Sequence, residues 1–345
     1  MNPLILSLLI LGLGLGTTIT FASSHWLLAW MGLEINTLAI IPLMAQHHHP
    51  RAIEATTKYF LTQATAAALI LFASMTNAWM TGQWEIQQMT QTIPTTMLTL
   101  ALMLKLGLAP THFWLPEVIQ GLDLTTGLIM STWQKLAPLS LLLQLPSLNS
   151  NLLIAVGLAS TMIGGWGGLN QTQLRKIMAY SSIAHLGWMV LIVTFNPKLT
   201  LLALIMYIIM TLAMFLVLKM NYSLNMNTLS TSWAKFPILT ASTPLILLSL
   251  GGLPPLSGFM PKWFILQELT KQELPLTATI AALSALLSLY FYLRLSYAMT
   301  LTTSPNTMMN TTPWRLNSAQ LTLPLSISIA LATLLLPMAP ALLAL

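Results

Sequence analysis

The fold is decided by residues 199–218, LTLLALIMYIIMTLAMFLVL, a run of 20 residues that contains no charged side chain. An α-helix needs about 20 predominantly apolar residues to cross the hydrocarbon core of a bilayer, whereas a barrel strand needs about ten residues of alternating polarity. Only helices and closed barrels satisfy every backbone N–H and C=O inside lipid. Because the run is long and does not alternate, it predicts a membrane-spanning helix.

The same apolar character extends over the whole chain. Of the 345 residues, 56% are hydrophobic and 6% are charged, and the mean hydropathy is +0.77. A soluble domain does not need this much apolar sequence to build one core, so soluble folds are excluded. Residues 1–22 lack the basic start of a signal peptide, and we therefore expect them to form the first membrane span.

Two further features of the composition limit the function. The chain contains no cysteine, which excludes thiolate metal sites, Fe–S clusters and disulfides. The net charge of +6 does not indicate nucleic-acid binding, because the basic residues are dispersed singly or in pairs. A glycine-rich stretch, GGWGGLNQ at 164–171, ends a predicted span and does not follow a strand, so it predicts close helix packing or a turn and no phosphate loop.

Polar clusters and Pro/Gly clusters divide the sequence into about eleven predicted spans, each near the length that a bilayer requires. We therefore expect one all-α, polytopic membrane domain over residues 1–345. The expected limits of the spans are 3–22, 25–44, 56–81, 95–120, 124–145, 149–169, 174–195, 198–220, 237–271, 275–301 and 321–343.

The distribution of Lys and Arg between the connections predicts the orientation. The basic residues assigned to connections after even-numbered spans are Arg51, Lys58, Arg175, Lys176, Lys235 and Arg315, with Lys219 nearby. Connections after odd-numbered spans offer only Lys198 and Lys271. Because the side that is not translocated keeps the positive excess, the N-terminus is expected on the positive side and the C-terminus on the opposite side.

Two predicted spans are interrupted by proline and glycine. They contain LMLKLGLAPTHFWLPEVIQG at 102–121 and LSLGGLPPLSGFMPKWFILQEL at 248–269. Proline removes a backbone donor and frees a carbonyl, which a membrane protein tolerates only where protein or a water-filled cavity satisfies it. Both spans are expected to be broken helices, and each break adjoins a lysine, Lys105 or Lys262.

The positions of the two breaks predict an internal repeat. If residues 3–145 and 149–301 each hold five spans, the broken span is the fourth in each, and an odd number of spans inverts the topology. Paired broken helices in inverted repeats are typical of ion-coupled transporters, with the site near the midplane. The terminal helix at 321–343 is expected to lie outside the repeats.

Several ionisable residues fall inside the predicted spans. A charged side chain at a helix centre costs roughly 2.5 to 3.5 kcal/mol on insertion scales, so its presence indicates a compensating role. Lysines near helix ends reach the interface by snorkelling, which we expect for Lys58, Lys219 and Lys271 but not for Lys135. The candidates for function are Glu34, Lys105, Lys135 and Lys262, with His112 and His185 as weaker members.

Structural alternatives remain for each candidate. Glu34 is able to neutralise a lysine in a packing ion pair, with Lys105 or Lys58 as its partner, although such pairs stabilise poorly. His112 and His185 are either satisfied core histidines or members of a relay. The run at 47–49, HHH, predicts a solvated loop and no metal site, since adjacent residues do not converge on one ion. Burial disfavours the charged lysine and a nearby carboxylate favours it, so a lysine with a movable partner is a switchable proton carrier.

Read in order, these motifs resemble a known family. Glu34, KLGLAPTHFWLPEV, WQKLAP around Lys135, AYSSIAHLGWM around His185 and GLPPLSGFMPKW before Lys262 are similar to the antiporter-like subunits of NADH:ubiquinone oxidoreductase, respiratory complex I. The resemblance covers the whole chain. Bacterial members and the related sodium/proton antiporters have about fourteen helices, and this chain resembles the short form of animal mitochondria, without three N-terminal helices.

The resemblance implies a role for each candidate. Glu34 matches the glutamate of the first half-channel, and Lys105 matches the lysine of the first broken helix. Lys135 matches the connecting lysine, and Lys262 matches the lysine of the second broken helix on the path to the outer compartment. His185 lies on the helix that usually carries a relay histidine between the lysines. His112 matches a position at which the residue type is less uniform within the family.

The resemblance also implies a setting. The chain is expected to be a proton-translocating membrane-arm subunit in the mitochondrial inner membrane, with its N-terminus on the matrix side. It is expected to hold no cofactor itself, while other subunits of the complex carry NADH, FMN, Fe–S clusters and ubiquinone. The expected partners are other membrane-arm subunits and lipids such as cardiolipin, so the chain is not expected to be a stand-alone monomer. A free-standing cation/proton antiporter and a non-pumping scaffold subunit are the alternatives.

Overall fold

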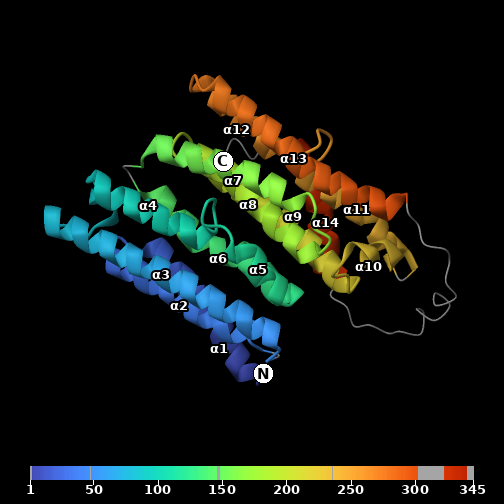
Figure 1. Cartoon of the computed structure of the whole chain (residues 1–345), viewed down its shortest axis with the longest axis horizontal. Coiled ribbons are helices and arrows are strands. Elements are labelled where there is room, and N and C mark those ends of the chain that lie inside the picture. The colour runs from blue at the N-terminus through green and yellow to red at the C-terminus, as the bar shows by residue number, and fades with distance from the viewer. Residues whose placement is uncertain (1, 47, 146–147, 235, 302–321, 340–345) are drawn as a thin grey trace. The chain divides into compact units, whose positions relative to one another are not determined.

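The computed structural model describes residues 2–46, 48–145, 148–234, 236–301 and 322–339, and over these residues the chain is helical with only two isolated β-bridges (Figure 1). The prediction of an all-α fold is confirmed. Among the described helices, six are long and apolar enough to cross a membrane: α1 (Pro3–Ala22), α2 (Trp26–Met44), α3 (Pro50–Thr81), α7 (Ser150–Gly168), α9 (Pro197–Met220) and α13 (Pro275–Thr300). Shorter apolar helices accompany them, and the count of eleven spans stays a prediction.

The chain divides into two compact units, Met1–Ser160 and Thr161–Leu345, with the boundary inside α7. In the first unit, α2 packs against α1 and α3, and α6 packs against α1, α2 and α4. The long helix α3 also packs against α4 and α5, the two halves of the first interrupted span. The remaining elements of this unit are η1 (Ile86–Gln88), α4 (Thr92–Leu106), α5 (Trp114–Gly121) and α6 (Leu124–Gln144).

Small residues bring α1 and α2 into backbone contact. A Cβ added at Gly16 would lie 2.5 Å from Asn36 Oδ1 and 2.8 Å from the carbonyl oxygen of Gly32. A Cβ added at Gly32 would lie 2.8 Å from the carbonyl oxygen of Gly16. Close approach of backbones through small residues is a usual way for helices to pack in membranes. It places the Asn36 amide directly against α1.

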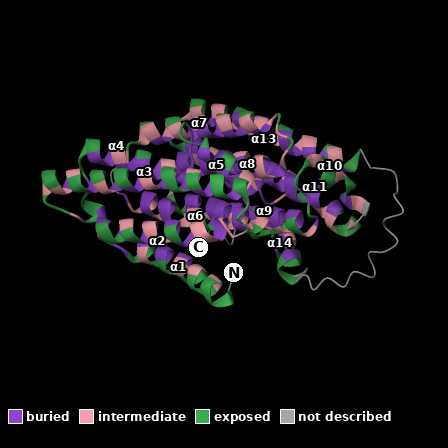
Figure 2. Cartoon of the chain, turned by 60° about the horizontal axis from the view of Figure 1, so that its bottom comes forward, coloured by how far each residue is buried: buried purple, intermediate pink, exposed green. Residues whose placement is uncertain are grey.

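The second unit is built around α9. This helix packs against α8, α11, α12 and α14, and α13 packs against α8, α10, α11 and α12. Most residues of α8 and α9 are buried, whereas only four residues of α1 are (Figure 2). The elements of this unit not yet given are α8 (Leu174–Ile192), α10 (Met226–Ser230), η2 (Thr231–Ala234), α11 (Pro237–Gly251), α12 (Phe259–Lys271), α14 (Thr322–Leu334) and η5 (Leu336–Met338).

Both predicted helix breaks are present, and they have the same backbone geometry. After α4, the Gly107 N–H donates to the carbonyls of Met103 (2.9 Å) and Leu104 (3.2 Å), and the Leu108 N–H donates to Met103 (3.1 Å). After α11, Gly252 and the residue after it repeat the same three bonds in the same register. Both glycines are left-handed, with φ +76° and +79°. This is the Schellman ending, which satisfies carbonyls that would otherwise be unpaired.

Helix α3 begins several residues before the approximate start expected for the third span. The span was expected to begin at residue 56, but α3 begins at Pro50, so Arg51 and Lys58 lie inside the helix and not in the connection before it. The reason is local: Pro50 occupies the first turn, where its missing N–H is harmless, and His49 Nδ1 accepts from the Arg51 N–H at 3.2 Å.

Other expected boundaries are only partly testable. The expected terminal helix at 321–343 corresponds to α14 and η5, and residues 340–343 lie outside the described residues. Arg175 and Lys176 lie in the first turn of α8. The described residues also leave out His47, Lys235 and Arg315.

We predict that Gly252→Ala destabilises the protein more than Gly82→Ala. Both glycines have positive φ, which costs a residue with a Cβ roughly 1 to 2 kcal/mol. At Gly82 the Cβ would meet nothing within 4 Å, whereas at Gly252 it would lie 2.9 Å from Lys262 Cδ and 3.0 Å from Nζ. Thermal unfolding of each variant in detergent measures the difference. Equal losses of stability would contradict the assigned packing of the second break.

Candidate functional site

Two of the candidate lysines line one cavity in the first unit. Lys105 on α4 and Lys135 on α6 are 6% and 2% exposed, and both border the same small cavity. The cavity leaves about 20 Å³ for the centres of water molecules, and one water needs roughly 10 to 15 Å³ on this measure. Its polar lining also includes Asn36, Thr37, Tyr59, Gln63 and Gln134. The site is therefore a buried chamber between helices, lined by both polar and apolar side chains.

The chamber contains polar atoms without a hydrogen-bond partner. Among the described residues, both amide atoms of Asn36, Nε2 of Gln63 and Nζ of Lys105 are buried and have no protein partner. A buried polar group without a partner costs about 1 to 3 kcal/mol, and more when it is charged. Several such atoms around a space large enough for water indicate that water completes their hydrogen bonds.

Glu34 acts on this chamber from α2. Its side chain is half-buried, and its Oε2 atom is buried without a hydrogen-bond partner among the described residues. The carboxylate interacts electrostatically with Lys105 and with Tyr59, which is 2% exposed. No hydrogen bond joins Glu34 to Lys105, since Lys105 Nζ has no partner in the described part of the chain. The two groups therefore influence each other without a fixed contact.

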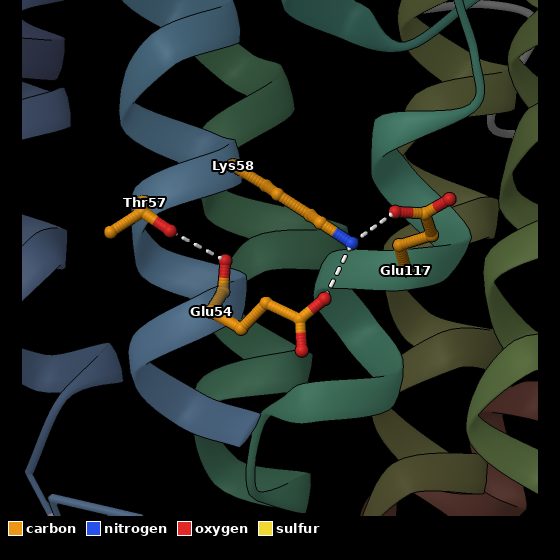
Figure 3. Close-up of polar contacts among 4 residues, drawn as sticks. All are labelled: Glu54, Thr57, Lys58 and Glu117. Carbon is orange, nitrogen blue, oxygen red and sulfur yellow. Dashed lines mark hydrogen bonds and ion pairs between the residues drawn. The ribbon is translucent and has the colours of Figure 1, made fainter. Parts of the chain in front are cut away.

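Lys58, the other partner considered for Glu34, is engaged elsewhere. Its Nζ lies 2.7 Å from Glu54 Oε1 and 2.7 Å from Glu117 Oε2 on α5 (Figure 3). All three side chains are largely exposed, at 42%, 63% and 53%. Lys58 thus joins α3 to the second half of the broken span, and Lys105 is the lysine on which Glu34 acts.

His112 lies in the loop between α4 and α5. It is 4% exposed, its Nδ1 lies 3.3 Å from the carbonyl oxygen of Pro110, and its ring packs against Phe113 with centroids 4.3 Å apart. It is not among the residues that line the chamber. These contacts are those of a residue that shapes the loop.

Lys262 and His185 belong to the second unit. Lys262 is 9% exposed, and its Nζ donates to the carbonyl oxygen of Gly251 at 2.8 Å, across the break between α11 and α12. His185 on α8 is half-buried and packs on the buried Tyr207 of α9, with ring centroids 5.6 Å apart. Lys262 therefore provides a hydrogen-bond donor for the carbonyl of Gly251, the last residue of α11.

Other site residues were not singled out from the sequence. Asn36, Gln63 and Gln134 line the chamber, and Gln134 Nε2 donates to the backbone carbonyl of Asn36 at 3.4 Å. Their signal was available, because uncharged amides inside apolar spans are also costly to bury. Arg294 in α13 was also missed, and its Nη1 donates to the carbonyl oxygen of Leu169 at 2.6 Å, just after the end of α7.

The histidine run gives no metal site among the described residues. His49 caps α3, and His48 lies in the connection before it with φ +46°. Within the described ranges, no group of three or more His, Asp or Glu residues is arranged to hold a metal ion. The ionisable groups in and beside the chamber are Glu34, Tyr59, Lys105 and Lys135, inside an all-helical membrane protein.

Comparisons with known proteins agree with this class of multi-pass membrane protein. The family described as NADH:quinone oxidoreductase/Mrp antiporter, TM, matches residues 23–288, and NADH dehydrogenase subunit 2 C-terminus matches residues 289–343. NADH-ubiquinone oxidoreductase chain 2 of Gadus morhua is 72% identical over 345 residues, covering 100% of this chain and 99% of that protein. The Salmo salar protein of that name is 72% identical over 342 residues, covering 99% and 98%. The chain belongs to the family of NADH-ubiquinone oxidoreductase chain 2, within the antiporter-like group.

Solved structures share the fold. A chain of respiratory complex I from Thermus thermophilus is 28% identical, with a TM-score of 0.85 over 98% of this chain and 80% of that one. A chain of the Mrp complex from Dietzia sp. is 17% identical, with a TM-score of 0.81 over 97% and 75%. The second likeness concerns the fold alone.

We predict that Lys262→Met lowers the stability of the protein by about 1 to 3 kcal/mol, because it leaves the Gly251 carbonyl unpaired in the break. Lys271→Met is the matched control on the same helix, since Lys271 is 61% exposed and lies 3.7 Å from Glu268. An exposed pair contributes about 0 to 1 kcal/mol. Thermal unfolding in detergent compares the two variants. A Lys262→Met protein as stable as the control would show that the lysine does not support the break.

Proposed function

We propose that the chain is a proton-translocating membrane-arm subunit of NADH:ubiquinone oxidoreductase in the mitochondrial inner membrane. The observation that carries this proposal is the polar chamber with two buried lysines, Lys105 and Lys135, in a chain of this family. Buried lysines are costly in a membrane and are typical of proton and ion pathways. Quinone reduction elsewhere in the complex supplies the free energy.

The site residues take successive places along the proposed path. Glu34 controls the charge on Lys105, because a carboxylate favours the ammonium form and its neutralisation releases the proton. Lys105 passes the proton to Lys135 through the chamber that both residues line. His185 continues the path in the second unit, and Lys262 leads it to the outer compartment. His112 supports the loop beside Lys105 and has a lesser part.

The proposal extends to the rest of the complex. This chain holds no redox or nucleotide site, and it contributes to catalysis as a core subunit while other subunits carry NADH, FMN, Fe–S clusters and ubiquinone. Other membrane-arm subunits and lipids such as cardiolipin are its partners. The N-terminus lies on the matrix side, in keeping with the distribution of basic residues along the sequence.

We further infer that residues 3–145 and 149–301 are two repeats of five spans, followed by a terminal helix. The sequences at 107–117 and 252–262 support this, because they share Gly, Leu, Pro and Pro in the same register. An isolated bridge before the second helix of each half supports it as well. His25 pairs with Glu85 in one half, and Gln173 pairs with Asn225 in the other.

The order of packing gives independent support for the repeat. In the first unit α3 packs against α2, α4 and α5, and in the second α9 packs against α8, α11 and α12. Likewise α6 packs against α2 and α4, as α13 packs against α8 and α11. Corresponding helices thus have corresponding neighbours.

Lys105→Met tests the function in the assembled complex. We expect fewer protons translocated per NADH oxidised, because the substituted side chain carries no proton, while Lys271→Met serves as the exposed control. Proton uptake into sealed vesicles, measured together with NADH oxidation, gives this ratio. Normal assembly with an unchanged ratio would favour a scaffold subunit.

The antiporter alternative predicts a different result. A free-standing antiporter would migrate alone after purification in gentle detergent and would exchange Na⁺ for H⁺ in vesicles. We expect instead that the chain migrates with the other subunits of the complex. Migration alone together with Na⁺/H⁺ exchange would overturn the proposed function.

A further inference from the structure

The chamber in the first unit is lined by two buried amide residues, Asn36 and Gln63, that have no place in the proposed path. Asn36 is 2% exposed and Gln63 is 4% exposed, and both line the chamber together with Lys105 and Lys135. Neither amide atom of Asn36 has a hydrogen-bond partner among the described residues, and neither has Gln63 Nε2. Both residues thus border one space, and each carries an unpaired polar atom.

The surroundings hold the Asn36 amide in place. Gly16 of α1 has no side chain, and a Cβ there would lie 2.5 Å from Asn36 Oδ1 and 2.8 Å from its Cγ. The backbone carbonyl of Asn36 accepts from Gln134 Nε2, which fixes α2 against α6. An amide packed this tightly has little freedom to turn toward another protein group.

The chamber has room for water at this place. Its volume of about 20 Å³ for water centres is sufficient for at least one molecule, which needs roughly 10 to 15 Å³ and two to four polar partners. The unpaired atoms of Asn36, Gln63 and Lys105 are such partners. A donor and an acceptor on the Asn36 amide suit a water molecule, which is itself both donor and acceptor.

We propose that Asn36 and Gln63 are positioning residues that hold a water molecule between Lys105 and Lys135 and so carry the proton step between the two lysines. This inference rests on the proposed function and adds the residues that make its first transfer possible. In the step, an N–H bond of the Lys105 ammonium breaks as an O–H bond forms on the water. A different O–H bond of the water breaks as an N–H bond forms on the neutral Lys135 amine. The charge moves from one lysine to the other and the water is regenerated.

The test substitutes Gln63 in the assembled complex by an apolar side chain of similar length. Gln63→Met keeps the packing but removes the amide, and the matched control is Asn77→Leu. Asn77 lies on the same helix and is fully buried, has an unpaired Oδ1, and does not line the chamber. Coupled NADH oxidation and proton uptake are measured in H₂O and in D₂O for both variants and for Lys105→Met.

For Gln63→Met we expect up to about ten-fold slower coupled turnover, the effect of losing one hydrogen bond between the Gln63 amide and the water molecule. We also expect a larger D₂O isotope effect, because proton transfer then limits the rate, while Asn77→Leu leaves the isotope effect unchanged. A merely structural role would change both variants alike and would not raise the isotope effect.

The outcomes separate this inference from the function on which it rests. If Lys105→Met reduces the protons translocated per NADH while Gln63→Met has an unchanged rate and isotope effect, the positioning role is overturned and the function stands. If Lys105→Met leaves that ratio unchanged in an assembled complex, the proposed function itself fails.

Discussion

The requirement that every backbone polar group be satisfied within the membrane governs this structure. It is most demanding at the two interruptions, where α4 and α11 end inside the protein. Both helices end in the same backbone motif around a left-handed glycine, but a different side chain completes each break. The Trp114 indole donates to the Leu104 carbonyl at 3.1 Å, whereas the Lys262 ammonium donates to the Gly251 carbonyl at 2.8 Å. The first break is therefore stabilised without a charged group.

This difference distinguishes the surroundings of the two lysines that adjoin the breaks, Lys105 and Lys262. Because Trp114 supports the first break, Lys105 beside it needs no role in the fold, and its Nζ has no partner among the described residues. Lys105 and Lys135 then share one chamber, with the Glu34 carboxylate acting on Lys105 from outside it.

The sequence predicted those features that depend on a single segment. Proline and glycine indicated both breaks, and the ionisable residues stood out against apolar spans. The partner of Glu34 could not be predicted, because Lys58 and Lys105 were equally available until the packing of α5 brought Glu117 to Lys58. The chamber was missed for the same reason. Asn36 and Gln63 lie on different helices, and hydropathy does not tell which faces of two helices meet.

The two interruptions show that shared backbone geometry permits different chemistry. Glu117 lies 10 residues after Gly107, as Lys262 lies 10 residues after Gly252, so a carboxylate occupies in one break the position that an ammonium occupies in the other. Glu117 is exposed and pairs with Lys58, and Lys262 is buried and pairs with a carbonyl. The two breaks share the turn that ends the helix, because this turn satisfies backbone carbonyls inside the membrane. The side chain ten residues after the glycine is not set by that requirement. One interruption can therefore join two helices at the surface, and the other can hold a buried lysine.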